Sequence, residues 1–216
     1  MKNSVFALAA SASLLFAGSA MGASIFINNG SVASNNDFTA EMAAAFGIAE
    51  GDLGFGLVYD IEIGAGGETV EAFLVAAESG FTNTFTLDDG SVESISETNN
   101  EVLDFANDDD GSVSGTFGAG LLATTEMFFD SDGAASSDGI FGDLSFGVYF
   151  DTTGSSDFVF LAFDDQAENP DDDNHDDMIL RFVAEGGVSV VPLPASALLL
   201  MGALAGLGAL RRARKS

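Results

Sequence analysis

The chain has 216 residues, of which 34 are acidic, 6 are basic and none is cysteine. All of the acidic residues lie between Asp37 and Glu185, where Arg181 is the only basic residue. This charge excludes nucleic acid and anionic membrane surfaces as partners, because both need a basic patch. The lack of cysteine excludes disulfide and thiolate chemistry. Hydrophobic residues make up 47% of the chain, which favours a packed core over a disordered acidic chain.

The first residues predict a secretory signal peptide over residues 1–23. Lys2 supplies a short basic start, and an apolar run and several small residues follow it. The apolar run is too short to span a bilayer comfortably, and an exit of small residues is typical of a leader that is removed. We therefore expect cleavage between Ala20 and Ser24, and the sequence leaves the exact bond open. The alternative is an N-terminal anchor that is not cleaved.

Residues 24–185 are predicted to form one all-β domain. Short apolar and β-branched runs recur, and Gly, Asn and Asp turn signals separate them. One helix is expected over residues 38–46, with Asn36 or Asp37 as its N-cap and Gly47 at its end. Many short strands with Asp-Gly turns favour an antiparallel β-sandwich that resembles a jelly roll. The expected strands cover residues 24–28, 56–63, 69–77, 83–87, 112–118, 124–129, 143–151, 157–163 and 178–184.

Alternation within the second expected strand indicates which of its faces is buried. Every second residue from Tyr59 onward is apolar in residues 56–63. We therefore expect Tyr59 to point into the core, and Asp60 and Glu62 to point to solvent. The chain has no tryptophan, and Tyr149 is its only other tyrosine. It therefore has few amphipathic rings on which a sugar could stack.

The most acidic segment, residues 164–177, follows the eighth expected strand and is the strongest candidate for a site. Its carboxylates repel one another, and a hard divalent cation removes that repulsion. Calcium takes about six to eight oxygen ligands and tolerates irregular geometry, so we predict a calcium ion here. The alternative is a solvated acidic loop that binds no ion. The predicted ligands are Asp164, Asp165, Asp172, Asn174, Asp176 and Asp177.

Catalysis is not expected, and we predict that the protein is not an enzyme. The domain has no cysteine and no lysine, and no serine elbow motif accompanies its single histidine, His175. An acid-pair glycosidase remains an open alternative, but acidic residues are so abundant that no pair stands out. His175 is expected at the surface, because zinc would need about three or four nitrogen or sulfur ligands together.

The end of the chain predicts a linker over residues 186–191 and a sorting tail over residues 192–216. A transmembrane helix over residues 195–210 would be about 24 Å long at about 1.5 Å per residue. This is short of the roughly 30 Å hydrocarbon core and indicates a marginal anchor. The basic cluster at 211–215 would stay in the cytoplasm. The helix is preceded by an extended, proline-containing motif: Val191, Pro192, Leu193, Pro194 and Ala195.

This motif, the weak apolar helix and the basic terminus together resemble the VPLPA variant of the PEP-CTERM sorting signals. The resemblance implies processing near the motif by an exosortase, an integral-membrane cysteine transpeptidase, after transient anchoring in the inner membrane of a Gram-negative bacterium. The alternative is an ordinary single-pass anchor. The acidic loop resembles the Asp-rich motif of DUF4114-like domains in residues 163–165 and 172–177, with departures at Asn174, His175 and Asp176.

The sequence therefore predicts an exported surface or extracellular-matrix protein with a structural or adhesive role and a calcium-stabilised β-sandwich. Its expected partners are the exosortase and, before cleavage, the inner membrane. A carbohydrate-binding module for exopolysaccharide is the alternative function, and nucleic acid is not expected as a partner.

Overall fold

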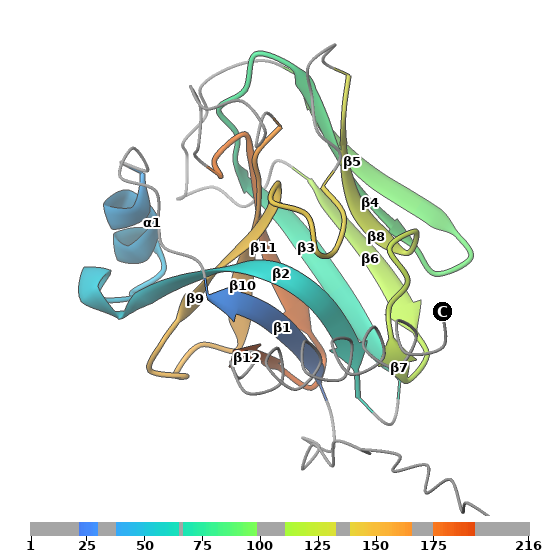
Figure 1. Ribbon diagram of the computed structural model, residues 1–216, viewed down its shortest axis with the longest axis horizontal. Helices are drawn as coiled ribbons and strands as arrows, with labels where there is room; N and C mark the ends of the chain where they lie inside the picture. Colours follow the sequence, from blue (N-terminus) through green and yellow to red (C-terminus); the bar gives the residue numbers. More distant parts are fainter. Residues whose placement is uncertain are drawn as a thin grey trace, which may run out of the picture.

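A computed structural model describes residues 22–29, 38–64, 67–98, 111–132, 139–165 and 175–192 of the protein. These residues form a mostly β protein with one short helix (Figure 1). In chain order the elements are β1 (Ala23–Asn29), α1 (Thr39–Ala45), the 3₁₀ turn η1 (Glu50–Asp52), β2 (Leu53–Ile63), β3 (Glu68–Ala76), β4 (Thr82–Asp88), β5 (Val92–Thr98), β6 (Ser112–Phe117), β7 (Gly120–Leu121), β8 (Met127–Ser131), β9 (Phe146–Asp151), β10 (Phe158–Phe163), β11 (Met178–Ala184) and β12 (Val188–Pro192).

The strands form two sheets. The larger sheet has nine strands in the order β12-β1-β2-β9-β10-β11-β3-β6, with β7 pairing beside β2. The smaller sheet has the order β5-β4-β8. Within both sheets the paired strands are antiparallel, except that β1 and β12 run parallel. The all-β prediction is confirmed, but the larger sheet is mixed rather than purely antiparallel.

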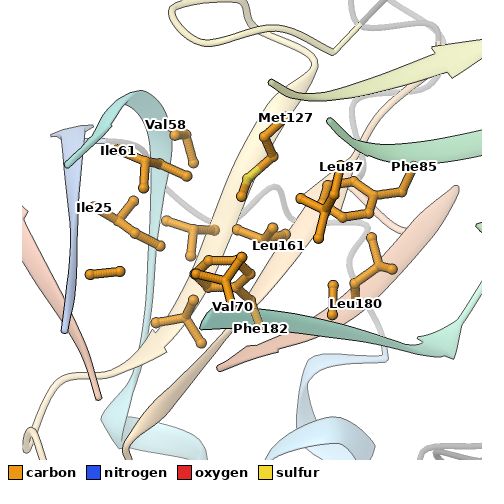
Figure 2. Packing of buried hydrophobic residues seen from close by; sticks show 14 of the residues in the cluster. Ile25, Val58, Ile61, Val70, Phe85, Leu87, Met127, Leu161, Leu180 and Phe182 are labelled. Atoms are coloured by element: carbon orange, nitrogen blue, oxygen red, sulfur yellow. The ribbon is translucent and has the colours of Figure 1, made fainter. Parts of the chain in front are cut away.

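The two sheets share one hydrophobic core. In Figure 2, Ile25 and Ile61 of the larger sheet lie on one side of this core, and Phe85 of the smaller sheet lies on the other. Leu161 and Phe182, from the middle of the larger sheet, lie between them. Burial of these side chains is the main stabilising contribution that the two sheets gain by meeting.

The helix α1 covers the opposite face of the larger sheet. Phe38 and Met42 are fully buried there, in a second cluster that includes Tyr149, Phe160 and Ile179. The expected end of the helix at Gly47 is confirmed, since Gly47 has a φ of +72°, which favours glycine after a helix. The expected N-cap at Asn36 or Asp37 is wrong. Phe38 occupies that position, and its own side chain makes no capping hydrogen bond.

The strand β2 contains a bulge that changes which side chains face the core. Phe26 pairs with Asp60 and the next residue, Ile27, pairs with Val58, so Tyr59 is the extra residue of the bulge. Val58 is therefore buried, and Tyr59 is 42% exposed. The expectation that Tyr59 points into the core is wrong for this reason.

Three strands have no counterpart in the prediction. Among residues 92–97 of β5 only Ile95 is buried, so an alternating apolar face is missing from its sequence. The strand β7 has two residues. The strand β12 covers most of residues 186–191, which were expected to form a linker. Two further strands begin later than expected, because residues 124–126 and 143–145 belong mainly to turns.

Phe129 of β8 joins the aromatic side chains of the two sheets. Its ring stacks on Phe163 of β10 with centroids 4.9 Å apart and meets Phe146 of β9 edge-on at 5.0 Å. It also contacts Phe85 of its own sheet at 4.9 Å. Gly139 packs directly against this stack, where a larger residue would not fit, because a Cβ there would lie 2.8 Å from the Phe163 ring. The ring of Phe129 is therefore held between both sheets.

We expect Phe129→Ala to lower the free energy of unfolding by about 3–5 kcal/mol, because it opens a cavity at the centre of this stack. The matched control is Tyr59→Ala, which removes a partly exposed ring and should cost about 0.5 kcal/mol or less. Urea denaturation of both variants in the same buffer measures the two losses. Equal losses would show that the core does not depend on the Phe129 stack.

Candidate functional site

Four aspartates gather where the β10–β11 hairpin ends its pairing. Asp164 and Asp165 directly follow β10, and Asp176 and Asp177 directly precede β11. Phe163 and Met178 are paired across the two strands, so both aspartate pairs lie at the same end of the hairpin. All four side chains are buried, with at most 4% of their surface exposed. Aspartate is rarely buried to this degree without a partner of opposite charge.

The smaller sheet and the segment before it contribute neutral polar groups to this cluster. Asp165 Oδ2 accepts hydrogen bonds from Ser79 Oγ at 2.6 Å and from Asn83 Nδ2 at 3.0 Å. Asn83 belongs to β4, and its Nδ2 also donates to the backbone oxygen of Asp177 at 3.3 Å. The backbone N–H of Asp165 donates to Asp177 Oδ2 at 2.8 Å. The acidic cluster thus connects the two sheets.

His175 is buried beside the cluster, so the expectation of a surface histidine is wrong. Its side chain is 6% exposed, and its ring centroid lies 5.0 Å from that of Phe55. The His175 Nε2 atom lies 2.8 Å from the backbone oxygen of Leu144. Gly147 leaves the necessary space, because a Cβ there would lie 2.5 Å from Phe55 and 2.8 Å from His175.

The buried carboxylates strongly affect one another. Burial raises the pKa of Asp177 to about 9, and the charges of Asp165, Asp176 and Asp164 act in the same direction. The N–H of Asp165 opposes this shift. Arg181 is the only basic residue in the described ranges, and its guanidinium carbon lies 4.6 Å from the ring centroid of Phe73. Among the described residues, the charges that act on Asp177 are those of the three neighbouring aspartates.

Two buried oxygens of the cluster accept no hydrogen bond from the described residues. They are Asp165 Oδ1 and Asn83 Oδ1. A buried polar atom without a partner costs about 1–3 kcal/mol, and carboxylate and amide oxygens are ligands that calcium prefers. Within the described ranges, however, no group of three or more His, Cys, Asp or Glu side chains is arranged to hold a metal ion. The part of the site that is described therefore supplies oxygens without closing a coordination sphere.

The six predicted metal ligands divide into two groups. Asp164, Asp165, Asp176 and Asp177 are brought together, whereas Asp172 and Asn174 lie outside the described residues. Asn83 and Ser79 are members of the cluster that the sequence analysis did not find. One signal was present for Asn83, because it alternates with Phe85 and Leu87 and so places an amide on a buried strand face.

The predicted sorting motif begins inside the larger sheet. Val191 and Pro192 are the last residues of β12, and they pair with Phe26 and Ile27 of β1. The other motif residues, Leu193, Pro194 and Ala195, lie outside the described residues, as do the predicted signal peptide up to Met21 and the predicted tail helix. Of the helices that the structure describes, none is long and apolar enough to cross a membrane.

Comparison with known proteins assigns no family to this chain. No protein-family model matches it, and no curated protein or solved structure matches it at a significant level. The cluster and the fold therefore carry the functional argument.

We expect the free energy of unfolding of the chelator-treated protein to fall as the pH rises from 5 to 8. Because the folded-state pKa of Asp177 is about 9, above its usual 3.8, the native state holds this proton more tightly than the unfolded state. The resulting stabilisation is complete below pH 3.8, decreases above it and is lost as the pH passes 9. Urea denaturation across this range measures the slope.

Asp177→Asn should flatten this slope, because it removes the titrating group. Asp157→Asn is the control, since Asp157 is exposed and lies just before the opposite end of β10. If Asp177→Asn leaves the slope unchanged, the pH dependence of the free energy of unfolding comes from the remaining carboxylates.

Proposed function

We propose that this is an exported surface or extracellular-matrix protein with a structural role, and that its domain is a calcium-stabilised β-sandwich. The burial of four aspartates carries the proposal, together with Asp165 Oδ1 and Asn83 Oδ1, which accept no hydrogen bond from the described residues. A buried negative charge is costly unless it is protonated or paired. The described residues supply only one basic side chain, so an external cation is the natural partner.

Calcium fits this cluster better than other common metal ions do. The oxygens around Asp165 and Asn83 are hard ligands, and calcium accepts them in irregular geometry. No cysteine is present and the only histidine packs against Phe55, so the soft and nitrogen ligands that zinc favours are missing from the cluster. Ligands from residues 166–174, which include the predicted Asp172 and Asn174, would complete the coordination sphere.

The ion would connect two parts of the domain that are far apart in the sequence. Asp165 and Asp177 belong to the β10–β11 hairpin, and Asn83 belongs to β4 of the smaller sheet. A cation held between them replaces carboxylate repulsion with attraction at the junction of the sheets. Because an ion that binds only the native state stabilises it, folding would be favoured where calcium is plentiful, outside the cytoplasm.

The export part of the proposal rests on the two chain ends. The signal-peptide pattern precedes β1, and the VPLPA-type tail continues from β12. In this proposal the exosortase acts on the tail after the domain has crossed the inner membrane. The surface role follows from this location and from the acidic charge of the domain.

Carbohydrate binding remains the second candidate because the domain has a suitable groove. A groove of about 400 Å³ lies between the β9–β10 turn and β12, and Phe150, Phe158, Thr152 and Ser189 are among its lining residues. Neither tyrosine is among its lining residues. The carboxylate of Asp151 already accepts hydrogen bonds from backbone N–H groups of its own turn. Glycan-array binding by the exported protein, lost on Phe150→Ala, would favour this candidate.

Calcium should raise the melting temperature of the exported protein relative to the chelator-treated protein. At a free calcium concentration about 100 times the Kd, the native state gains about 2.7 kcal/mol. For a domain of this size the shift is roughly 5 to 10 °C. Differential scanning calorimetry measures it, and magnesium at the same concentration should give a smaller shift because it demands octahedral geometry. Equal melting temperatures with calcium and with chelator would refute the calcium site.

Asp165→Asn should remove most of the calcium-dependent shift, because it takes away the charge of a central ligand. The matched control is again Asp157→Asn, which removes one exposed carboxylate at the other end of the same strand and should keep the full shift. Loss of the shift in both variants would indicate general charge screening instead of a defined site. Cell fractionation tests export separately.

A further inference from the structure

Gly22 is part of the folded domain although it lies within the predicted signal peptide. It is buried, its N–H donates to Glu68 Oε1 at 2.8 Å, and its backbone oxygen accepts from Gly64 N at 2.8 Å. Its φ of +108° is a conformation that favours glycine. Both backbone groups of Gly22 are therefore used inside the fold.

The neighbouring turn leaves no room for a side chain on Gly22. A Cβ on Gly22 would lie 2.4 Å from the backbone oxygen of Gly187 and 2.7 Å from that of Gly186. The next residue, Ala23, donates its N–H to Gly187 O at 2.9 Å and is 1% exposed in the main core. Removing Gly22 or Ala23 would therefore remove contacts of the native domain.

Glu68 connects this segment to the turn before β12. It is 4% exposed, and its second carboxylate oxygen accepts from Gly186 N at 3.1 Å. A chain that began at Ala23 would leave Glu68 Oε1 without the Gly22 N–H in a buried position, which is unfavourable. A chain that began at Ser24 would also lack the buried methyl group and the N–H of Ala23.

We propose that signal peptidase hydrolyses the Ala20–Met21 bond, an assignment that rests on the proposed export. Water adds across the C–N bond, so Ala20 leaves with the new carboxylate and Met21 gains the α-ammonium group. The small residues Gly18 and Ala20 stand three and one positions before this bond, as an A-x-A-like site requires. The Gly22–Ala23 bond also has small residues at these two positions, but its cleavage would discard Gly22.

The test is the N-terminal sequence and intact mass of the protein that a bacterial host exports from the full chain. The expected N-terminal sequence is Met-Gly-Ala-Ser, beginning at Met21. A mature N-terminus at any other residue overturns the assignment while leaving export intact. The absence of any exported form overturns the proposed export as well.

A pair of leader variants tests the same bond independently of folding. Gly18→Leu places a large residue three positions before the Ala20–Met21 bond and should cause loss of the Met21 form, with precursor accumulating. Ser19→Leu is the control, because the middle position of an A-x-A-like site accepts any residue, and it should leave the Met21 form unchanged. An unaltered yield of mature protein from Gly18→Leu would overturn the assignment, since cleavage at Gly22–Ala23 does not use Gly18.

Discussion

Four aspartate side chains are buried where the β10–β11 hairpin meets β4, and the structure around them must offset the cost of that burial. On one side lies the aromatic core, in which Phe163 stacks on Phe129 directly before Asp164. On the other side Asn83 and Ser79 supply hydrogen bonds to only one oxygen of Asp165. The apolar packing holds the carboxylates together, and their mutual repulsion opposes it. A proton on Asp177 or a cation at the cluster resolves this conflict.

These two solutions predict different conditions under which the domain is stable. A protonated cluster gives a domain whose stability falls as the pH rises, whereas a cation gives a domain whose stability depends on the cations in its surroundings. The composition favours the second solution, because all 34 acidic residues fall within the domain and Arg181 is its only basic residue. A cation at the junction of the sheets also acts where packing has already brought the ligands together, so little further ordering of Asp165 and Asn83 is needed.

The sequence predicted local features well and long-range ones poorly. Alternation and turn residues located most of the strands, since they reflect burial of every second side chain. The edge strand β5 was missed because only Ile95 is buried among its residues 92–97. Tyr59 was placed on the wrong face because one bulge reverses the alternation. The acidic segment 164–177 predicted that Asp165 and Asp177 would lie together, but the participation of Asn83 depends on how the two sheets pack, which no local pattern encodes. The burial of His175 depends on the distant Phe55 and Gly147 in the same way.

The parallel pairing of β1 with β12 joins the first strand of the domain to the last. Ala23 pairs with Val188 and Ile27 with Pro192, so the larger sheet is complete only when nearly the whole chain is present. Pairing over such a sequence separation is slow, because the entropy of closing the loop is lost before the contacts form. In the proposed export route the tail emerges last, so an anchored tail would hold β12 near the membrane while β1 is already outside. Because the strands are parallel, the chain enters this sheet edge at Ala23 and leaves it at Pro192, at the opposite end of the pairing. Gly22 and Glu68 form their hydrogen bonds at the Ala23 end, away from the residue at which the predicted tail begins.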